Sequence, residues 1–313
     1  MEHIEKKILL TADDSLSAKN AVRYCVRMSA YIKNLTYTLF HVQPAVSGFL
    51  VDEAKTNMKA RSKMAKLKKE NARKSKEMLE ELKSDMVGMG IEADRIETRT
   101  ASRKQGLDKD IIEHAQEGKY DALVVGRRGF SRVQEVFVGS LTAKLVAHSQ
   151  VTPLWVVDGK VKSDKILVAV DGSESALRAV DHVSFITGGS PDVEITLVHV
   201  ISKLRDYCPI DSDDSGGVVE YIISQGEKRC IENFIFHTYQ RFRKAGLHDE
   251  RIQLKEIHKT VGGVGKAIMK EAKNGDYGTV VLGRRDFNKS FFTDSVSNHI
   301  FSRTSGRAIW LVT

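Results

Sequence analysis

DALVVGRRGFSRVQEVFVGSLTAKLVAH, residues 121–148, is the stretch that points most directly to a fold. Residues 121–125 are mostly apolar and predict a buried strand, which runs straight into Gly126-Arg127-Arg128-Gly129. After nine further residues, Gly139 and Ser140 precede a helical run. Glycines at a strand exit let backbone N–H groups approach an anion, and a helix start adds outward-pointing amides. The stretch therefore predicts a phosphate cradle, although glycines at strand ends also form ordinary turns.

The chain contains a second copy of this unit. DALVVGRR, ending at Arg128, matches GTVVLGRR, ending at Arg285. KKILLTADDS near the start likewise matches DKILVAVDGS from Asp164, which aligns Asp13 with Asp171. A repeat of about 155 residues has the size of a whole domain. We therefore expect two domains, residues 1–158 and 164–313, separated by a short polar linker.

Strand-like and helix-like segments alternate within each copy. Apolar, β-branched strands that alternate with helices predict an α/β fold, with a parallel sheet covered on both faces. Ligands of such sheets bind beyond the carboxyl ends of the strands, where the strand order switches. Asp13, Val42 and Gly126 each follow or end a predicted strand, so we expect them to face one crevice. The expected elements of the first copy are strands 7–12, 36–42, 91–100, 121–125 and 154–157, and helices 15–30, 52–87, 108–117 and 141–148.

The composition is that of an ordinary globular protein. Of the 313 residues, 41% are hydrophobic and 29% are charged, and no apolar run reaches the ~18 residues of a membrane span. The N-terminus lacks the layout of a signal peptide. Cys25, Cys208 and Cys230 have neither metal-binding nor CxxC spacing. We therefore expect a cytoplasmic protein with reduced thiols and no metal site.

The net charge of +8 is concentrated in one segment. Between Lys55 and Lys76, ten basic residues accompany a single acid, Glu70. Two interpretations stay open: a solvated helix face, or a contact surface for an anionic partner such as nucleic acid or a membrane. No aromatic residue interrupts the run, which weakens the case for stacking on single strands. The solvated face is therefore the preferred interpretation, and nucleic acid is not an expected partner.

ILLTADDS, FHV at 40–42 and VVGRRG-x9-GS together resemble a tandem universal stress protein. The nucleotide motif of this family is G-x2-G-x9-G-[S/T], and Gly126, Gly129, Gly139 and Ser140 match it at every spacing. The resemblance covers essentially the whole chain. It implies two doubly wound domains of the Rossmann-like, adenine nucleotide alpha hydrolase-like type, each with a mainly parallel five-stranded sheet. It also implies a regulatory role in the stress response.

The resemblance further implies an ATP site, with or without Mg²⁺, in the first domain. By analogy with the ATP-binding members, ribose and base would meet Thr11, Ala12, Asp13 and Val42, with Val125 and Gly126 beside the glycine loop. The phosphates would lie on the amides of Gly129, Gly139, Ser140 and Leu141, assisted by the hydroxyls of Ser140 and Thr142. A carboxylate such as that of Asp13 can accept two ribose hydroxyls. Arg127 and Arg128 are interpreted as loop arginines that add charge or remain solvated.

The second copy departs from the motif. Asp171 and Gly283 are kept, but Asp286 and Asp294 replace two of the glycines, and the segment between them shrinks from nine residues to seven. Two carboxylates in place of the phosphate-binding glycines would repel a triphosphate. We therefore expect a structural or partner-binding role for this domain, and a site for some other ligand stays open.

No general base or nucleophile is positioned by the sequence, so we expect a nucleotide-binding regulator with at most slow hydrolysis. A slow ATPase or phosphotransferase is the alternative. His41 and His199, at matching positions, are expected to be packed and hydrogen-bonded. Domains of the family usually dimerise through their last strands. Segments 154–157 and 309–312 are therefore expected to pair within the chain as a pseudo-dimer, while a homodimer and a protein partner stay open.

Overall fold

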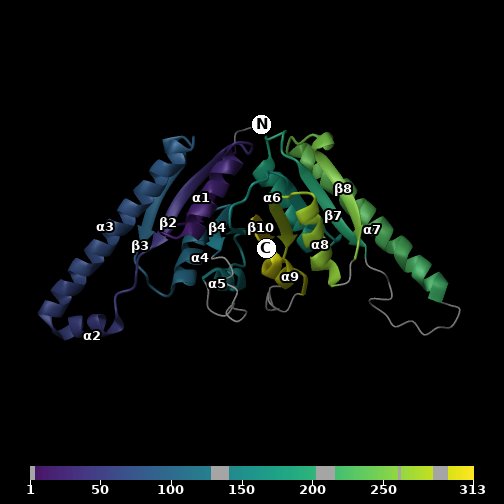
Figure 1. The fold of residues 1–313 in the computed structure, drawn as a ribbon. Helices are drawn as coiled ribbons and strands as arrows, with labels where there is room; N and C mark the ends of the chain where they lie inside the picture. The colour runs from purple at the N-terminus through teal and green to yellow at the C-terminus, as the bar shows by residue number, and fades with distance from the viewer. Residues whose placement is uncertain (1–3, 128–140, 202–215, 260–261, 285–294) are drawn as a thin grey trace. The chain divides into compact units, whose positions relative to one another are not determined.

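The computed structural model describes residues 4–127, 141–201, 216–259, 262–284 and 295–313. The chain forms two compact units. Unit 1 contains Met1–Ser29 and Asn34–Lys160, and unit 2 contains Ala30–Lys33 and Val161–Thr313. Each unit has a parallel five-stranded sheet with helices between successive strands (Figure 1). The predicted fold class is confirmed.

In unit 1 the strand order is β3-β2-β1-β4-β5. Leu10 of β1 is paired with Leu39 of β2 on one side and with Val124 of β4 on the other. The chain reverses its direction across the sheet between β3 and β4, which makes β1 and β4 the switch point. The elements are β1 (Lys6–Thr11), α1 (Leu16–Ser29), β2 (Leu35–Val42), α2 (Gly48–Thr56), α3 (Met58–Gly88), the 3-10 helix η1 (Ala93–Arg95), β3 (Ile96–Ala101), α4 (Leu107–Glu117), β4 (Ala122–Arg127), α5 (Leu141–His148) and β5 (Leu154–Asp158).

Helices cover both faces of this sheet. Ile8, Leu9 and Leu10 of β1 are all 0% exposed, as expected for a strand buried on both sides. The right-handed crossover rule places α1 and α3 on one face, because β1, β2 and β3 follow one another outward. It places α4 and α5 on the other face. Accordingly, α1 packs against α3, and α4 packs against α5.

The long helix predicted over residues 52–87 is instead two helices. The chain breaks at Asn57, whose backbone is extended at φ −110° and ψ 116°. The Asn57 side chain accepts hydrogen bonds from the amides of Lys59 (2.9 Å) and Ala60 (3.3 Å). Asparagine caps helices well because its side chain replaces the missing acceptor at the helix start. The α2–α3 pair is therefore a helical hairpin with a capped joint.

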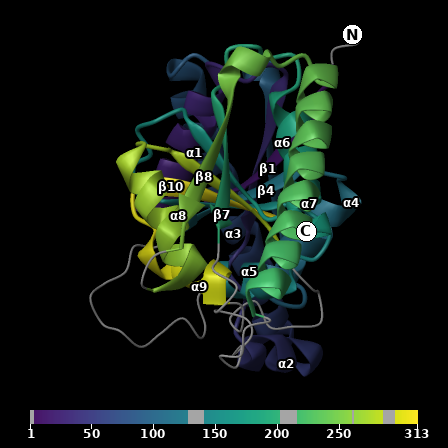
Figure 2. The same ribbon diagram turned by 90° about the vertical axis from the view of Figure 1, so that its right-hand side faces the viewer.

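Unit 2 repeats the topology, with strand order β8-β7-β6-β9-β10. Leu167 of β6 is paired with Thr196 of β7 and Val280 of β9. Figure 2 shows α7 as a long helix, which packs against α6. The elements are β6 (Ile166–Val170), α6 (Glu174–Thr187), β7 (Ile195–Ile201), α7 (Gly216–Lys244), the 3-10 helix η3 (Asp249–Arg251), β8 (Ile252–His258), α8 (Gly263–Asn274), β9 (Thr279–Gly283), α9 (Ser295–Arg303) and β10 (Arg307–Val312).

Two of the three cysteines lie in described segments. Cys25 is buried, and its burial raises the pKa of the thiol, whereas Cys230 is exposed. Cys208 lies outside the described residues. Among the described helices, none is long and apolar enough to cross a membrane. A pairing of residues 154–157 with 309–312 would join the two units, and it stays a prediction.

Candidate functional site

The predicted crevice of unit 1 is formed where β1, β2 and β4 end. β1 lies between β2 and β4, so Ala12, Val42 and Gly126 occupy the same edge of the sheet. The amide of Ala12 donates to the carbonyl of Phe40 at 2.9 Å and extends the β1–β2 pairing by one residue. Ala12 and Val42 are 5% and 7% exposed, so both side chains lie at the buried base of this edge.

The carboxylate of Asp13 is held by a tight turn at the start of α1. Its Oδ1 accepts the amide of Ser15 at 3.0 Å and also the hydroxyl of Ser15. The same hydroxyl accepts the amide of Ala18 at 3.2 Å and lies 2.8 Å from the hydroxyl of Ser17. The serine thus caps α1, and the aspartate orients the serine. The turn fixes the direction of Asp13 at the edge of the crevice.

Two polar side chains near the ends of β1 and β2, those of Thr11 and His41, contact backbone carbonyls of unit 1. The hydroxyl of Thr11 donates to the carbonyl of Val124 at 3.1 Å, so it ties β1 to β4. The Nδ1 atom of His41 lies 2.7 Å from the carbonyl of Ala12. In unit 2, His199 makes the matching contact with Val170 at 3.1 Å. The predicted hydrogen-bond contacts of both histidines are confirmed, and both side chains are half-buried.

Gly126 has a packing role that the sequence did not predict. A Cβ atom at this position would lie 2.1 Å from the carbonyl oxygen and 2.3 Å from the carbonyl carbon of Ser17. These are backbone atoms at the start of α1, which cannot move aside like the end of a flexible side chain. Only glycine therefore permits this close approach of β4 and α1. The contact brings the turn around Asp13 up against the end of β4.

Arg127 was predicted to be a loop arginine, either adding charge to the site or solvated, and this placement in a loop is wrong. It is the last residue of β4, only 6% exposed, and its Nη1 lies 3.5 Å from Oδ2 of Asp158 at the end of β5. Burial raises the pKa of Asp158, and the charge of Arg127 opposes this shift. The error arose because the predicted strand ended at residue 125, whereas β4 continues for two more residues and includes Arg127.

The remaining predicted positions follow β4. Val125 is buried in β4, Leu141 is the first residue of α5, and Thr142 is 8% exposed in the first turn of that helix. The amides of a first helical turn lack partners within the helix and suit an anion. Arg128, Gly129, Gly139 and Ser140 lie outside the described residues.

Unit 2 builds the same strand-end turn. Oδ1 of Asp171 accepts the amide of Ser173 at 3.0 Å, and the Ser173 hydroxyl accepts the amide of Ala176 at 3.2 Å. A Cβ atom at Gly283 would lie 1.9 Å from the carbonyl oxygen of Ser175. The described parts of the two crevices therefore match closely. Asp286 and Asp294, which carry the predicted difference, lie outside the described residues.

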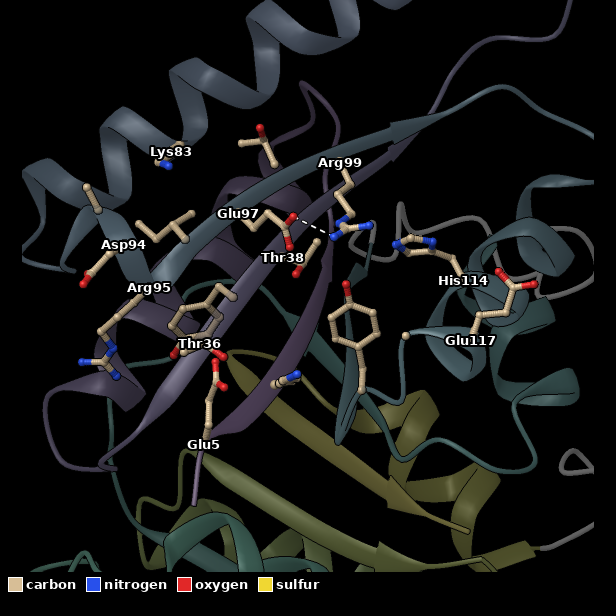
Figure 3. Close-up of a pocket in the computed structure, with 17 residues that line it drawn as sticks. Glu5, Thr36, Thr38, Lys83, Asp94, Arg95, Glu97, Arg99, His114 and Glu117 are labelled. Atoms are coloured by element: carbon tan, nitrogen blue, oxygen red, sulfur yellow. Dashed lines mark ion pairs between the residues drawn. The ribbon is translucent and has the colours of Figure 1, made fainter. Parts of the chain in front are cut away.

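A cavity that the sequence did not predict lies at the other end of the strands of unit 1, away from Asp13. It has a volume of about 770 Å³ and opens over the amino ends of β1, β2 and β3 (Figure 3). Lys7, Thr36 and Arg99 line it from the strands, and His114 and Tyr120 line it from the region of α4. Because the strands are parallel, this cavity and the crevice around Asp13 lie at opposite ends of the strands.

The charges that line this cavity balance one another. Arg99 pairs with Glu97 at 2.8 Å, as Figure 3 shows. The ring of His114 stacks on Phe40 at a centroid distance of 4.0 Å. Burial and the nearby charge of Arg99 lower the pKa of this histidine. Polar residues that alternate along β3 were the available sequence signal, but exposed edge strands show the same alternation.

The described residues contain no group of three or more His, Cys, Asp or Glu side chains arranged to hold a metal ion. The described part of the site consists of backbone groups, the oriented carboxylate of Asp13 and small buried side chains. This arrangement suits recognition of a polar organic ligand.

Comparison with protein-family models identifies the family of the chain. The model of the Universal stress protein family matches residues 5–158 and again residues 162–306. This chain belongs to the universal stress protein family. As a two-domain universal stress protein, it contains one family match in each unit. The search of the curated proteins finds no match.

Solved structures of tandem length share the fold. A universal stress protein from Archaeoglobus fulgidus is 18% identical, with a TM-score of 0.64 and coverage of 98% of both chains. A putative universal stress protein from Pseudomonas aeruginosa is 13% identical, with a TM-score of 0.56 and coverage of 99% of this chain and 94% of the other. A universal stress protein solved in complex with cAMP is 18% identical and covers 48% of this chain and 96% of its own, with a TM-score of 0.33.

Proposed function

We propose that this universal stress protein is an ATP-binding regulator in which unit 1 holds the nucleotide. Unit 2 is a structural or partner-binding copy. The observation that carries the proposal is the near-identity of the two strand-end turns around Asp13 and Asp171. Because these turns match, the difference between the units falls on the segments after β4 and β9. There, unit 1 has the complete glycine motif and unit 2 has two aspartates.

The residues of unit 1 fit an adenine nucleotide. Ala12 and Val42 supply a small apolar surface for the base, and the oriented carboxylate of Asp13 would accept ribose hydroxyls. The amide of Leu141 at the start of α5, with those of Gly129, Gly139 and Ser140, would hold phosphates. Mg²⁺ would then be held chiefly by the phosphates themselves, since the described residues offer no metal cluster.

Calorimetric titration of the intact chain with ATP tests the proposal, and we expect about one site per chain. Gly139→Asp, which copies the residue at Asp294, should abolish binding through charge repulsion. Ser295→Ala, in the matching segment of unit 2, is the control and should leave the titration unchanged. Two equal sites would contradict the division of roles, and no binding would contradict the proposal.

The same samples separate a binder from a slow ATPase. We propose that the bound nucleotide is not turned over, because no water-positioning base accompanies the predicted phosphate segment. Chromatography of nucleotide released after long incubation should recover ATP. Mg²⁺-dependent formation of ADP that disappears in Gly139→Asp would instead establish the enzymatic alternative.

A further inference from the structure

The first half of α3 extends away from the sheet of unit 1. α3 lies wholly within the described residues, and none of its residues between Ala60 and Ser75 is buried. This stretch is about 20 Å long at 1.5 Å per residue. Figure 1 shows it with α2 at its end, beyond the strands of unit 1. This stretch contacts α2 but buries none of its own side chains, so it gains little stability from burial.

A row of basic residues runs along the outer face of this helix. All ten Lys and Arg residues between Lys55 and Lys76 are exposed. Six of them recur every three or four residues, which places them on one face, turned away from buried Leu82 and Met86. The row is about 25 Å long. We call it the basic stripe; its members are Lys59, Lys63, Lys66, Lys69, Arg73 and Lys76.

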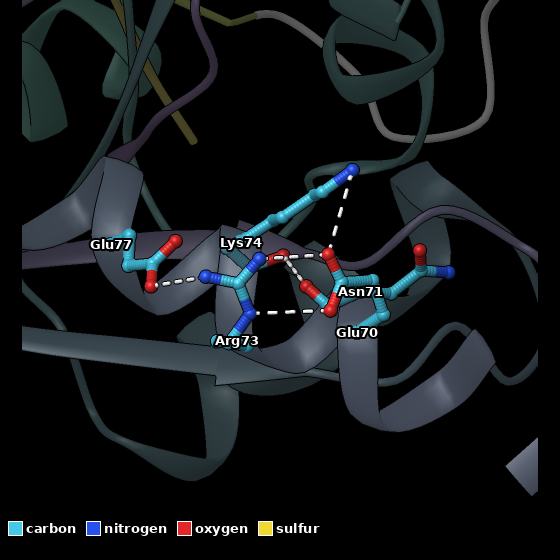
Figure 4. Close-up of polar contacts among 6 residues, drawn as sticks. Glu70, Asn71, Arg73, Lys74 and Glu77 are labelled. Carbon is cyan, nitrogen blue, oxygen red and sulfur yellow. Dashed lines mark hydrogen bonds and ion pairs between the residues drawn. The ribbon is translucent and has the colours of Figure 1, made fainter. Parts of the chain in front are cut away.

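The positive charge available on the stripe belongs to lysines. Arg73 pairs with Glu70 at 2.8 Å and with Glu77 at 2.6 Å, as Figure 4 shows. Arg61 donates to the carbonyls of Ala54 and Lys55 at the end of α2. The five lysines of the stripe have no acidic partner within ion-pair distance among the described residues. The two planar guanidinium groups suited to bidentate phosphate or base contacts are therefore already engaged.

Large apolar side chains are exposed on the same hairpin. Phe49 in the first turn of α2 is 80% exposed, and Met58 at the start of α3 is 83% exposed. Val51 and Leu67 are 39% and 40% exposed. Side chains of this kind enter the boundary between headgroups and acyl chains, and lysine stems reach from there to the headgroups. A nucleic-acid backbone offers no comparable apolar layer.

We propose that α2 and the first half of α3 form a docking surface for bilayers that contain anionic phospholipids. The stripe lysines contact the headgroups, and Phe49 and Met58 enter the outer edge of the acyl layer. The charge complementarity, the exposed apolar residues and the engaged arginines favour a lipid surface over nucleic acid. Attachment of this kind is peripheral and reversible, and it does not depend on nucleotide binding.

Co-sedimentation of the intact chain with vesicles tests the proposal. We expect binding to vesicles of mixed phosphatidylcholine and phosphatidylglycerol, none to phosphatidylcholine alone, and loss of binding at high salt. The variant Lys59→Gln, Lys63→Gln, Lys66→Gln, Lys69→Gln should bind at least about tenfold more weakly, since each surface lysine contributes to attraction by anionic lipid. A control that loses the same charge elsewhere, Lys160→Gln, Lys162→Gln, Lys244→Gln, Lys273→Gln, should bind like the unmodified chain.

A second pair of substitutions tests the apolar contact. Phe49→Ser with Met58→Gln should weaken vesicle binding several-fold while leaving its salt dependence unchanged. The far-ultraviolet circular dichroism spectrum verifies that each variant is folded. Equal binding by the lysine variant and its control would overturn the proposal. So would tighter retention on duplex or single-stranded nucleic acid than on vesicles at the same salt, or a change of oligomeric state caused by the lysine substitutions.

Discussion

At the scale of single residues, glycine and histidine positions matter for reasons that depend on their neighbours. Gly126 and Gly283 belong to a nucleotide motif and a degenerate copy of it, yet both meet the backbone at the start of a helix. This shared steric need explains why unit 2 keeps Gly283 although it has lost two other glycines. The first glycine of the motif is therefore needed for packing in both units, whereas the positions of Gly129 and Gly139 differ between the units.

Gly126→Ala should lower the free energy of unfolding by about 2–3 kcal/mol, because the added Cβ overlaps the Ser17 carbonyl. Gly283→Ala should have a similar effect through Ser175. Urea titrations measure both. Gly226→Ala in α7, where nothing lies within 4 Å of the added Cβ, is the control and should stabilise by about 0.5–1 kcal/mol. Equal effects at all three positions would contradict the steric argument.

His182 predicts a pH dependence of stability. It is buried beside Trp310, with ring centroids 5.7 Å apart, and burial lowers its pKa to about 3. The unfolded chain, with an ordinary histidine pKa near 6.5, binds the proton first as the pH falls, so acid favours unfolding. Between pH 6.5 and 4.5 this histidine should remove about 2 kcal/mol of stability.

The comparison is between the unmodified chain and His182→Gln, both unfolded by urea across this pH range. The difference between their unfolding free energies should change with pH in the stated direction, because glutamine does not titrate. A constant difference would show that the buried imidazole is not the origin of the acid sensitivity.

At the scale of elements, the α2–α3 hairpin depends on the residue that joins its helices. The sequence suggests one long helix over residues 52–87, with apolar residues at helical spacing in its second half and a mostly charged first half. Asn57 interrupts it because one side chain satisfies two amides of α3. After Ser75, α3 packs on the sheet. Before Ser75, its contacts among the described residues are with α2, with the Asn57 cap and with the carbonyl of Pro44, which accepts a hydrogen bond from Asn71.

Asn57→Ala should destabilise the first turns of α3 by about 1 kcal/mol, as expected for the loss of a cap. Because the hairpin can open without the rest of unit 1, the effect should be local. Hydrogen exchange of the amides at residues 59–65 should accelerate about fivefold, while exchange in β1 and β4 stays unchanged. Asn57→Asp keeps an acceptor and should exchange like the unmodified chain; faster exchange there would contradict the capping role.

At the scale of the whole molecule, two units of the same topology are proposed to respond differently to one ligand. A ligand that binds only one folded unit stabilises that unit by mass action. Each unit has its own core and its own set of strands, so the effect on one can be measured beside the other as an internal reference.

ATP at one hundred times its dissociation constant should stabilise unit 1 by about 2.7 kcal/mol. In hydrogen exchange, protection should increase in β1, α1 and β4, with little change in β6, α6 and β9. The Gly139→Asp chain provides the control, in which ATP should protect neither unit. Equal protection of both units would contradict the proposed asymmetry.

The sequence by itself determined the duplication, the alternation of strands and helices, the glycine motif and the clustering of charge. These features depend on residue order and local periodicity, and the α/β class, the parallel sheets and the crevice at the ends of β1, β2 and β4 follow from them. The two packed histidines could also be predicted, because they recur at the same strand position in both copies.

Only the tertiary structure decided what each position touches. It showed that Gly126 lies against Ser17, that Arg127 is buried beside Asp158, and that a cavity opens at the amino ends of the strands. It also showed that the basic stripe projects from the sheet instead of packing on it. Such facts depend on contacts between residues distant in sequence, about which local periodicity carries no information. A charged helix has the same pattern whether it covers a core or extends beyond one.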